Sequence, residues 1–551
     1  MNDFLIITSD LSTIVYSLLA VFFTALIALY YYVETSRVVR LSKRLPHPPS
    51  LPIIGHALIT MGLSPETVLV VALQHHKRYG SVISVYFGTR VVIALTDPKD
   101  IEIILGSSVH LDKSVEYRYF RPWLGDGLLI TTGDKWLRHR KVIAPTFHMR
   151  ILKTFVPVFY ENSMDLVRQL RDKVGKEFDC HDYLSTVTVD ILMETAMGVK
   201  KKQRTGYDYA MAVMKMSDIL HRRHYDFRLR SDITFKFSKF AKKQEKLLNI
   251  IHILTNNVIE EKSRSIDDIK EEQKNDQKKK PMENEIKNNE NDKNITYTKL
   301  HYVRDDLDDI DENDIGEKKR LAFLEMMIDL KKNGGKMTDE EIWEEVNTIM
   351  FEGHDTTAAG SSFTLCILGN HQDIQSRVYE ELYTIFGDSD RQCTFQDTLE
   401  MKYLERVILE TLRLFPPVPI IARKLNEDVQ IITGNYILPK SATILIPPFA
   451  VHRLEEYYPN PTVFNPDNFL PEKMQQRHYY AFIPFSAGPR SCVGRKFAML
   501  KLKVLLSTIL RNYRVISDVA DNDFVLQGDI ILKRHDGFKI KLEPREPISR
   551  T

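Results

Sequence analysis

The chain has 551 residues, of which 43% are hydrophobic and 27% are charged. This balance is typical of globular proteins and excludes a wholly disordered chain or a fibrous repeat. The 76 Lys and Arg residues nearly balance the 74 Asp and Glu residues, which argues against a nucleic-acid-binding protein that depends on a strongly basic field. The four cysteines include no Cys-x-x-Cys pair, so a disulfide framework and a zinc ribbon are not expected.

The first predicted element is a membrane anchor over residues 11–33, a run of 23 positions without a charged residue. About 20 apolar residues suffice to span a bilayer. Acidic residues precede the run and basic residues, among them Arg37 and Arg40, follow it. The positive-inside bias then places residues 1–10 in the lumen and the rest of the chain in the cytosol. A cleaved signal peptide is the alternative, although its apolar core is usually shorter and follows basic residues.

Residues 34–55 are predicted to be a basic, proline-rich linker. Four prolines between Pro46 and Pro52 fix φ and prevent helix formation. We expect a stiff spacer that sets how the following domain sits on the membrane.

Residues 56–262 and 317–551 are predicted to form one mainly α-helical domain with a small β portion. Two short β-branched runs, 82–87 and 90–95, flank a Gly88-Thr89 turn and predict a hairpin. Helical spacing dominates from Phe147 onward, with further strands expected near residues 429–432, 443–446 and 529–533.

A charged segment over residues 263–316 interrupts this domain. It carries 26 charged residues among 54 positions, with no apolar period. Such a stretch cannot bury enough surface to offset its ordering entropy, so we expect a disordered insertion.

The predicted chemistry lies near the C-terminus, around Cys492. The segment reads Phe485-Ser-Ala-Gly-Pro-Arg-Ser-Cys-Val-Gly-Arg495, and an amphipathic helix is expected from Lys496 to Tyr513. A helix N-terminus favours thiolate over thiol. A thiolate as the axial ligand of haem iron favours O–O bond cleavage. The alternative, an inert buried cysteine, suits Cys180, Cys366 and Cys393.

The residues flanking Cys492 suit a flat, acidic cofactor. Gly488 and Gly494 lack side chains, so the backbone could approach such a cofactor closely. Arg490 could pair with a cofactor carboxylate in bidentate fashion.

A long apolar helix is predicted from Asp339 to about Gly369, yet its middle reads Gly353-His-Asp-Thr-Thr357. Gly and Thr weaken a helix, and such local conflicts tend to mark functional sites. Splitting O2 requires two protons, so Asp355 is predicted to relay protons and Thr356 to hydrogen-bond dioxygen or water. The alternative is a buried helix with solvated polar positions.

The pattern Phe485-x-x-Gly-x-Arg-x-Cys-x-Gly494 resembles the haem-binding signature of the cytochrome P-450 superfamily. The resemblance implies the P-450 fold, haem b as cofactor, and Cys492 as the axial ligand of the iron. Trp136-Leu-Arg-His-Arg140 resembles the family's Trp-x-x-x-Arg, in which both residues reach a haem propionate.

Two further motifs resemble those of the superfamily and occur in the same order along the chain. Glu410-Thr-Leu-Arg413 resembles the helical Glu-x-x-Arg, whose side chains at i and i+3 can form an ion pair. Pro461–Phe469 resembles the family's meander segment, although many members have Arg where this chain has Asn468.

Residues 351–357 are similar to family 4 of the superfamily, whose members typically hydroxylate fatty acids at the ω end. In that family the glutamate at the position of Glu352 can form an ester to a haem methyl group. Family 4 also includes members that act on xenobiotics, insecticides or hormone-like lipids, and these substrates remain an alternative.

The chain carries no flavin- or nicotinamide-binding signature, so electrons must come from a separate protein. The resemblance implies NADPH–cytochrome reductase, assisted by cytochrome b5, for a single-pass protein of the endoplasmic reticulum membrane with its catalytic domain in the cytosol. The candidate basic contacts for an acidic donor are Arg138, Arg140, Lys141, Arg495, Lys496 and Lys501. The alternative is that some of them bind propionates and the others are simply solvated.

The expected reaction is RH + O2 + NADPH + H⁺ → ROH + H2O + NADP⁺, with a lipophilic RH. Two alternative functions belong to classes other than the monooxygenases. One is a haem–thiolate isomerase or dehydratase that rearranges peroxides without a reductase, and the other is a non-catalytic haem-binding membrane protein.

Overall fold

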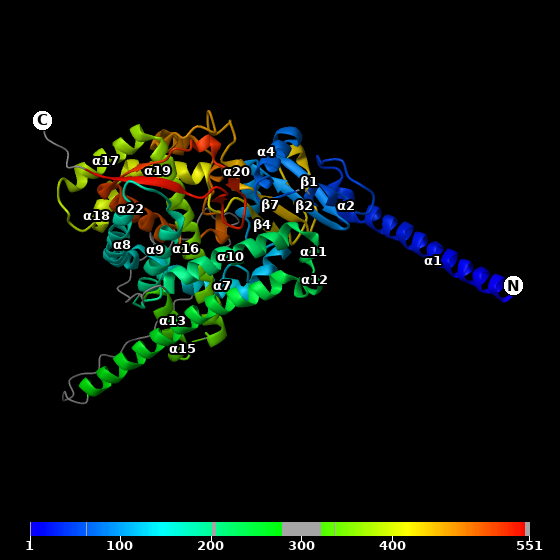
Figure 1. Cartoon of the computed structure of the whole chain (residues 1–551), viewed down its shortest axis with the longest axis horizontal. Coiled ribbons are helices and arrows are strands. Elements are labelled where there is room, and N and C mark those ends of the chain that lie inside the picture. Colours follow the sequence, from blue (N-terminus) through cyan, green and yellow to red (C-terminus); the bar gives the residue numbers. More distant parts are fainter. Residues whose placement is uncertain (1, 62, 201–204, 278–320, 336, 546–551) are drawn as a thin grey trace.

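The computed structural model describes residues 2–61, 63–200, 205–277, 321–335 and 337–545. Helices form most of the body, and a group of strands lies at the end from which the N-terminal helix projects (Figure 1). The predicted fold class, mainly α with a small β portion, is confirmed.

The N-terminal helix α1 (Asn2–Thr35) contains the predicted span. Its segment Thr13–Thr35 has a mean hydropathy of 2.2 and is, within the described part of the chain, the one helix long and apolar enough to cross a membrane. A short helix, α2 (Arg37–Ser42), follows. Val33, Val39 and Leu45 are buried in the same apolar cluster as the neighbouring strands, so the end of α1 is fixed to the body.

The strands next to α2 form a sheet in the order β1-β2-β7-β4. The predicted hairpin is confirmed, because Val82 pairs with Leu95 and Phe87 with Arg90 across the antiparallel pair β1–β2. β7 runs parallel to β2 and antiparallel to β4. The elements of this part are α3 (Ala57–Met61), α4 (Val68–Tyr79), β1 (Val82–Phe87), β2 (Arg90–Leu95), α5 (Pro98–Leu105), β4 (Ile421–Lys424), β5 (Val429–Gln430), β6 (Ile437–Leu438), β7 (Thr443–Ile446) and α20 (Pro448–Val451).

The helical part surrounds α16 (Asp339–Asn370), which packs against α9, α10, α13, α19 and α22. Thr338 and Glu341 begin α16 with a capping box, in which each side chain accepts a hydrogen bond from the other's backbone N–H. The helices of this part are α6 (Arg121–Leu124), α7 (Gly133–Ile143), α8 (Met149–Leu170), α9 (His181–Glu194), α10 (Thr205–Tyr225), α11 (Phe227–Arg230), α12 (Asp232–Lys236), α13 (Lys239–Gln277), α15 (Phe323–Lys332), α17 (Gln372–Phe386), α18 (Phe395–Glu400), α19 (Lys402–Leu414), α21 (Pro471–Gln476) and α22 (Arg495–Asn512).

The other strands form three small sheets, one in the order β3-β11-β8, one with β9 beside β10 and one with β5 beside β6. Their bounds are β3 (Glu177–Asp179), β8 (Tyr513–Ile516), β9 (Leu526–Gln527), β10 (Lys533–Arg534) and β11 (Lys539–Pro544). The strand predicted over residues 529–533 is therefore wrong except at Lys533. The Asp529 carboxylate accepts a hydrogen bond from the N–H of Ile530 at 2.7 Å, and such a local bond competes with a strand ladder.

Helix α13 extends farther than expected. It continues to Gln277, so residues 263–277 are helical and the boundary predicted at residue 263 is wrong. The apolar face continues through the buried Ile266, and Lys332 of α15 pairs with Asp267 at 2.5 Å. Residues 278–316 of the predicted insertion lie outside the described residues.

Candidate active site

Cys492 lies in a loop immediately before α22, as predicted. Its N–H donates to the carbonyl of Phe485 at 2.8 Å, and Gly494 is the residue that caps the helix. The thiol is half-buried and belongs to no disulfide, whereas Cys180, Cys366 and Cys393 are buried. The placement leaves Cys492 able to present a thiolate next to a helix N-terminus.

The lack of a side chain has a different consequence at each of the two glycines of this loop. Gly488 has a φ of +69°, and a Cβ there would stand 2.0 Å from the carbonyl oxygen of Leu105. Only glycine fits, because the loop crosses directly over the end of α5. At Gly494 a Cβ would meet only the Cys492 sulfur, at 3.9 Å, so its absence leaves space beside the thiol.

Arg490 and the two predicted residues of α7 form one cluster. The Arg490 guanidinium lies 4.4 Å from the centroid of the Trp136 ring and donates to the carbonyls of Leu111 and Leu128 at 2.9 and 3.1 Å. Arg140 donates to the carbonyl of Ser491, next to Cys492, at 2.9 Å. Trp136, Arg140 and Arg490 are thus neighbours beside the loop that carries Cys492, and their predicted contact with a haem propionate stays a prediction.

Two cations that the sequence did not single out join this cluster. Lys113 and Arg423 face each other across an isolated antiparallel bridge, and Arg423 is 1% exposed. Burial lowers the pKa of Lys113 well below its usual range, with Arg423 and Arg490 adding to the effect and Glu352 and Cys492 opposing it. A local sequence pattern gives no signal for either residue, because the bridge joins segments 310 positions apart.

The cluster carries an excess of positive charge. Burial, together with the neighbouring Arg423 and Arg140, lowers the pKa of Arg490 to about 9, although Asp112 opposes the shift. Crowded, desolvated cations require an anionic partner. Haem carries two propionates beside a flat ring, and these cations next to the Cys492 thiol fit such a group.

Helix α16 faces the cluster with one narrow accessible strip. Between Glu344 and Gly369 every residue is buried except Glu352, Gly353 and Thr356. The spacing i, i+1 and i+4 places these three on one side of the helix. They therefore border an internal space. A Cβ at Gly353 would stand 2.9 Å from the side chain of Leu192, so this glycine allows α9 to pack closely against α16.

Glu352 is the acid on this strip. Burial raises its pKa to about 7, while Lys113 and Arg140 oppose the shift and Glu345 adds to it. Because Lys113 also interacts with Cys492, the Glu352 carboxyl and the thiol belong to the same site.

Asp355 and Thr356 point in different directions. The Thr356 hydroxyl donates to the carbonyl of Glu352, one turn earlier, at 2.8 Å. Asp355 is fully buried, and Lys533 of β10 lies 3.6 Å from its Oδ1 atom. The two side chains predicted to act together are thus adjacent in sequence, but only Thr356 borders the internal space.

The predicted ion pair of α19 is present and fully buried. Arg413 donates to both oxygens of Glu410, each at 2.7 Å, and also to the carbonyls of His452 and Pro461. The Asn468 amide donates to Glu410 at 3.1 Å. Asn468 therefore takes part in the network in place of the arginine found in many members of the superfamily.

A second set of carboxylates clamps α7 onto α16. His139 lies 2.6 Å from Glu345, Lys135 lies 2.6 Å from Glu344, and Arg138 pairs with Glu341. The clamp holds Trp136 and Arg140 against the site. Sequence reasoning missed it, because glutamates in the first turns of a helix usually face solvent.

The prediction of basic contacts for an electron donor is wrong at two positions. Arg140 and Lys501 are buried, so neither faces a partner. Lys141 is exposed, and Arg495 and Lys496 are half-exposed.

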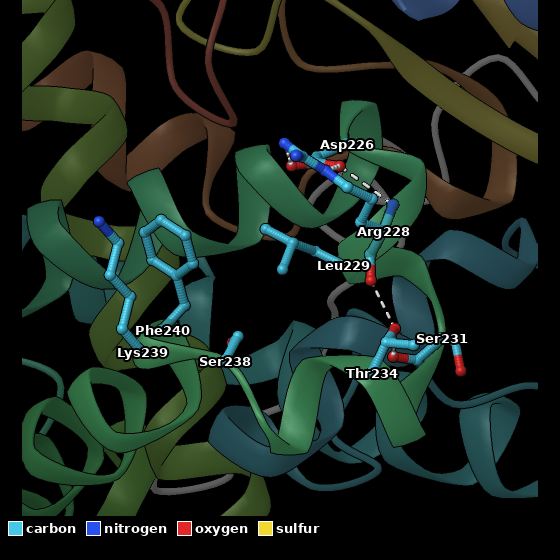
Figure 2. A pocket seen from close by; sticks show the side chains of 8 residues that line it. All are labelled: Asp226, Arg228, Leu229, Ser231, Thr234, Ser238, Lys239 and Phe240. Carbon is cyan, nitrogen blue, oxygen red and sulfur yellow. Dashed lines mark hydrogen bonds and ion pairs between the residues drawn. The ribbon is translucent and has the colours of Figure 1, made fainter.

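A hollow of about 540 Å³ lies between α11 and α13, away from this site (Figure 2). It is lined by Asp226, Arg228, Leu229, Ser231, Thr234, Ser238, Lys239 and Phe240. None of these residues belongs to the cysteine loop, the cationic cluster or the accessible strip of α16.

Comparison with known proteins agrees with this geometry. The profile of the family described as Cytochrome P450 matches residues 45–542. Cytochrome P450 4g15 of Drosophila melanogaster is 51% identical over 94% of this chain and 95% of its own length. Cytochrome P450 4g1 of the same organism is 51% identical over 94% and 92%, and human Cytochrome P450 4V2 is 36% identical over 91% and 89%. The chain therefore belongs to the cytochrome P450 family and is a haem-containing monooxygenase of its family 4.

Proposed function

We propose that the protein hydroxylates a fatty acid or related lipid at or near its ω end. The observation that carries this proposal is Glu352. It is the acid on the accessible strip of α16, and it shares the neighbour Lys113 with Cys492. Glu352 is the residue that would carry an ester bond to a haem methyl, and a fixed haem favours attack at a chain terminus.

Each site residue has a proposed role. Cys492 would ligate the iron, and Arg490, Trp136 and Arg140 would hold the propionates. Haem held by the Cys492 thiolate would supply the activation of O2 and the cleavage of its O–O bond. Asp355 would move protons, and the Thr356 hydroxyl would orient water or dioxygen at the accessible strip.

The setting of the enzyme is part of the proposal. α1 would anchor the chain in the endoplasmic reticulum membrane, with the catalytic domain in the cytosol, since basic residues follow the span. NADPH–cytochrome reductase would supply the electrons, assisted by cytochrome b5. Arg138, Lys141, Arg495 and Lys496 are the predicted basic contacts that retain solvent exposure.

Acid–acetone extraction tests the role of Glu352. Part of the haem should stay with the wild-type chain and none with Glu352→Ala. Complete extraction from both proteins would contradict the ester. Analysis of the products formed from medium- and long-chain fatty acids should show hydroxylation at the terminal carbon, and products confined to internal carbons would contradict the substrate assignment.

The haem–thiolate assignment has its own test. The reduced protein with carbon monoxide should show the thiolate-type Soret band, and Cys492→Ser should abolish it. Cys393→Ser, a buried cysteine away from the site, serves as the control and should keep the band.

A further inference from the structure

The loop between α6 and α7, residues 125–132, lies directly against α16. The N–H of Leu128 donates to Oε2 of Glu345 at 3.1 Å. A Cβ at Gly127 would stand 2.2 Å from the hydroxyl oxygen of Thr348 and 2.8 Å from a backbone oxygen of α16, so only glycine allows so close an approach. The loop is therefore held on the helix by a buried carboxyl group and by a position that excludes any side chain.

The same loop holds Arg490 on its other side. The guanidinium of Arg490 donates to the carbonyls of Leu128 and Thr131, at 3.1 Å for Leu128. Leu128 thus stands between two side chains, because its N–H is held by Glu345 and its carbonyl holds Arg490. A shift of this loop on α16 would carry the guanidinium with it, since hydrogen bonds to a carbonyl depend on distance and angle.

The other oxygen of Glu345 fixes α7. Its Oε1 atom lies 2.6 Å from Nδ1 of His139, and neither side chain is exposed to solvent. His139 directly precedes Arg140, which donates to the carbonyl of Ser491, and it shares α7 with Trp136. One carboxyl group therefore fixes both segments that supply the predicted propionate contacts.

Glu345 also relates these segments to the accessible strip of α16. Glu345 and Glu352 are seven positions apart, about two helical turns, so they lie on the same side of the helix. The charge of Glu345 adds to the effect of burial, which raises the pKa of Glu352. The helix thus sets the separation between the residues predicted to hold the propionates and the acid on the strip.

We propose that Glu345 is a positioning residue for the haem, an inference that rests on the propionate contacts proposed for Arg490, Trp136 and Arg140. Glu345 is fully enclosed by protein atoms, so it acts through its neighbours and does not touch haem or substrate. It holds the N–H of Leu128 and the imidazole of His139 at the same time. Both cations are thereby kept at the propionate edge, at a fixed distance from the strip.

The reduction potential of the haem iron separates positioning from a direct effect of the Glu345 charge. Reduction adds an electron, which nearby cations favour and a nearby carboxylate opposes. Loss of the charge alone would raise the potential, whereas displacement of Arg490 and Arg140 would lower it. In the full-length holoenzyme in phosphatidylcholine vesicles, Glu345→Ala should lower the ratio of ferrous to ferric haem at a fixed potential about tenfold, a shift of about 59 mV for one electron. An unchanged or raised potential would overturn the proposal.

Glu345→Gln provides the conservative comparison. Its amide oxygen can still accept from the N–H of Leu128, but its charge is gone. This variant should therefore keep the wild-type potential or exceed it slightly. An equal fall in Glu345→Gln and Glu345→Ala would show that the contact with Leu128 does not position the haem.

A double-mutant cycle tests whether Glu345 acts through Arg490. Arg490→Met removes a cation and should lower the potential by itself. Adding Glu345→Ala to Arg490→Met should lower it by less than the sum of the two single effects, because residues that act through one contact are not additive. Full additivity would contradict the coupling.

The failure of this inference and that of the proposed function give different results. If Arg490→Met lowers the potential but Glu345→Ala does not, positioning by Glu345 is wrong and the propionate role of Arg490 stands. If Arg490→Met leaves the potential unchanged, the role of Arg490 itself fails, and the inference with it.

Amide hydrogen exchange of the holoenzyme reports on the contact directly. Residues 125–131 should exchange faster in Glu345→Ala and at the wild-type rate in Glu345→Gln, which keeps an acceptor for Leu128. Asp100→Ala is the matched control, because Asp100 is also fully buried and accepts from the N–H of Ile432 at 2.9 Å. It should change neither this exchange nor the potential. An equal fall in potential in Asp100→Ala would overturn the specific role of Glu345.

Discussion

Lys501 of α22 donates a hydrogen bond to the carbonyl of Gly353 in α16 at 2.7 Å. The contact joins the helix that follows Cys492 to the residue at the centre of the accessible strip. The lysine is fully buried, and this burial lowers its pKa to about 7. An uncharged amine at this position costs far less than an ammonium would.

Replacement of Lys501 should change how stability depends on pH. Between pH 7 and pH 10.5 the unfolded chain holds the Lys501 proton and the folded chain does not, so the free energy of unfolding rises with pH by up to about 5 kcal/mol. Lys501→Met should lack this rise. Urea unfolding at pH 7 and pH 9 measures the difference, with the exposed Lys402→Met as control. The same pH dependence in Lys501→Met and wild type would contradict the assignment.

Loss of the Glu410–Arg413 ion pair should lower the free energy of unfolding more than loss of the neighbouring Asn468 side chain. Glu410→Gln leaves a buried guanidinium without its counter-charge and should lower the free energy of unfolding by about 3–5 kcal/mol. Asn468→Ala removes one hydrogen bond to a carboxylate that keeps Arg413, and should cost about 1–3 kcal/mol. Denaturant midpoints of the two variants provide the comparison. An equal loss in both would show that the ion pair is not the dominant contact.

Arg423 should contribute to haem retention through its charge. Arg423→Met removes one cation from the cluster and should weaken haem binding about tenfold, which corresponds to about 1.4 kcal/mol, while Arg423→Lys should weaken it less. The rate of haem transfer to an acceptor protein measures the change. Arg264→Met, an exposed arginine of α13, should have no effect. Equal loss in Arg423→Lys and Arg423→Met would favour a packing role over charge.

Gly488→Ala should disturb the cysteine loop more than a similar change elsewhere. Gly488 and Gly387 both have a left-handed φ, but a Cβ at Gly387 meets nothing within 4 Å. Gly387→Ala should therefore cost only the backbone strain, about 1–2 kcal/mol, whereas Gly488→Ala adds the clash with Leu105. The yield of the thiolate-type carbon monoxide band should fall in Gly488→Ala alone. Similar yields would show that the loop can shift.

The sequence predicted those parts of the site that lie within one local motif. Cys492, Arg490 and their glycines share a single loop, and Glu410 and Arg413 share one helical turn, so spacing alone indicates how they meet. Lys113 and Arg423 meet through a bridge between distant segments, and no local pattern reports such a pairing. The orientation of Asp355 was equally hidden, because its partner Lys533 lies in a strand of two residues whose predicted position was mostly wrong.

The length of α13 was misjudged for a related reason. Residues 263–277 have the composition of a solvated segment. The residues that stabilise these last turns of α13 come from α15, which follows the charged insertion in the sequence. Charged residues there form ion pairs such as Lys332 with Asp267. Composition reports how many charges a segment carries, but not whether another helix supplies the opposite ones.

The junction between α1 and the body has a mechanical consequence for the enzyme. Val33 and Val39 are buried with the sheet, and Arg37 of α2 forms an ion pair with Asp428 in the body. Helix α1 is therefore held firmly against the body and is not joined to it by a flexible linker. A transmembrane helix adjusts its tilt to the thickness of the bilayer, so, with α1 placed in a bilayer as proposed, a thinner or thicker membrane would turn the whole catalytic domain relative to the lipid surface.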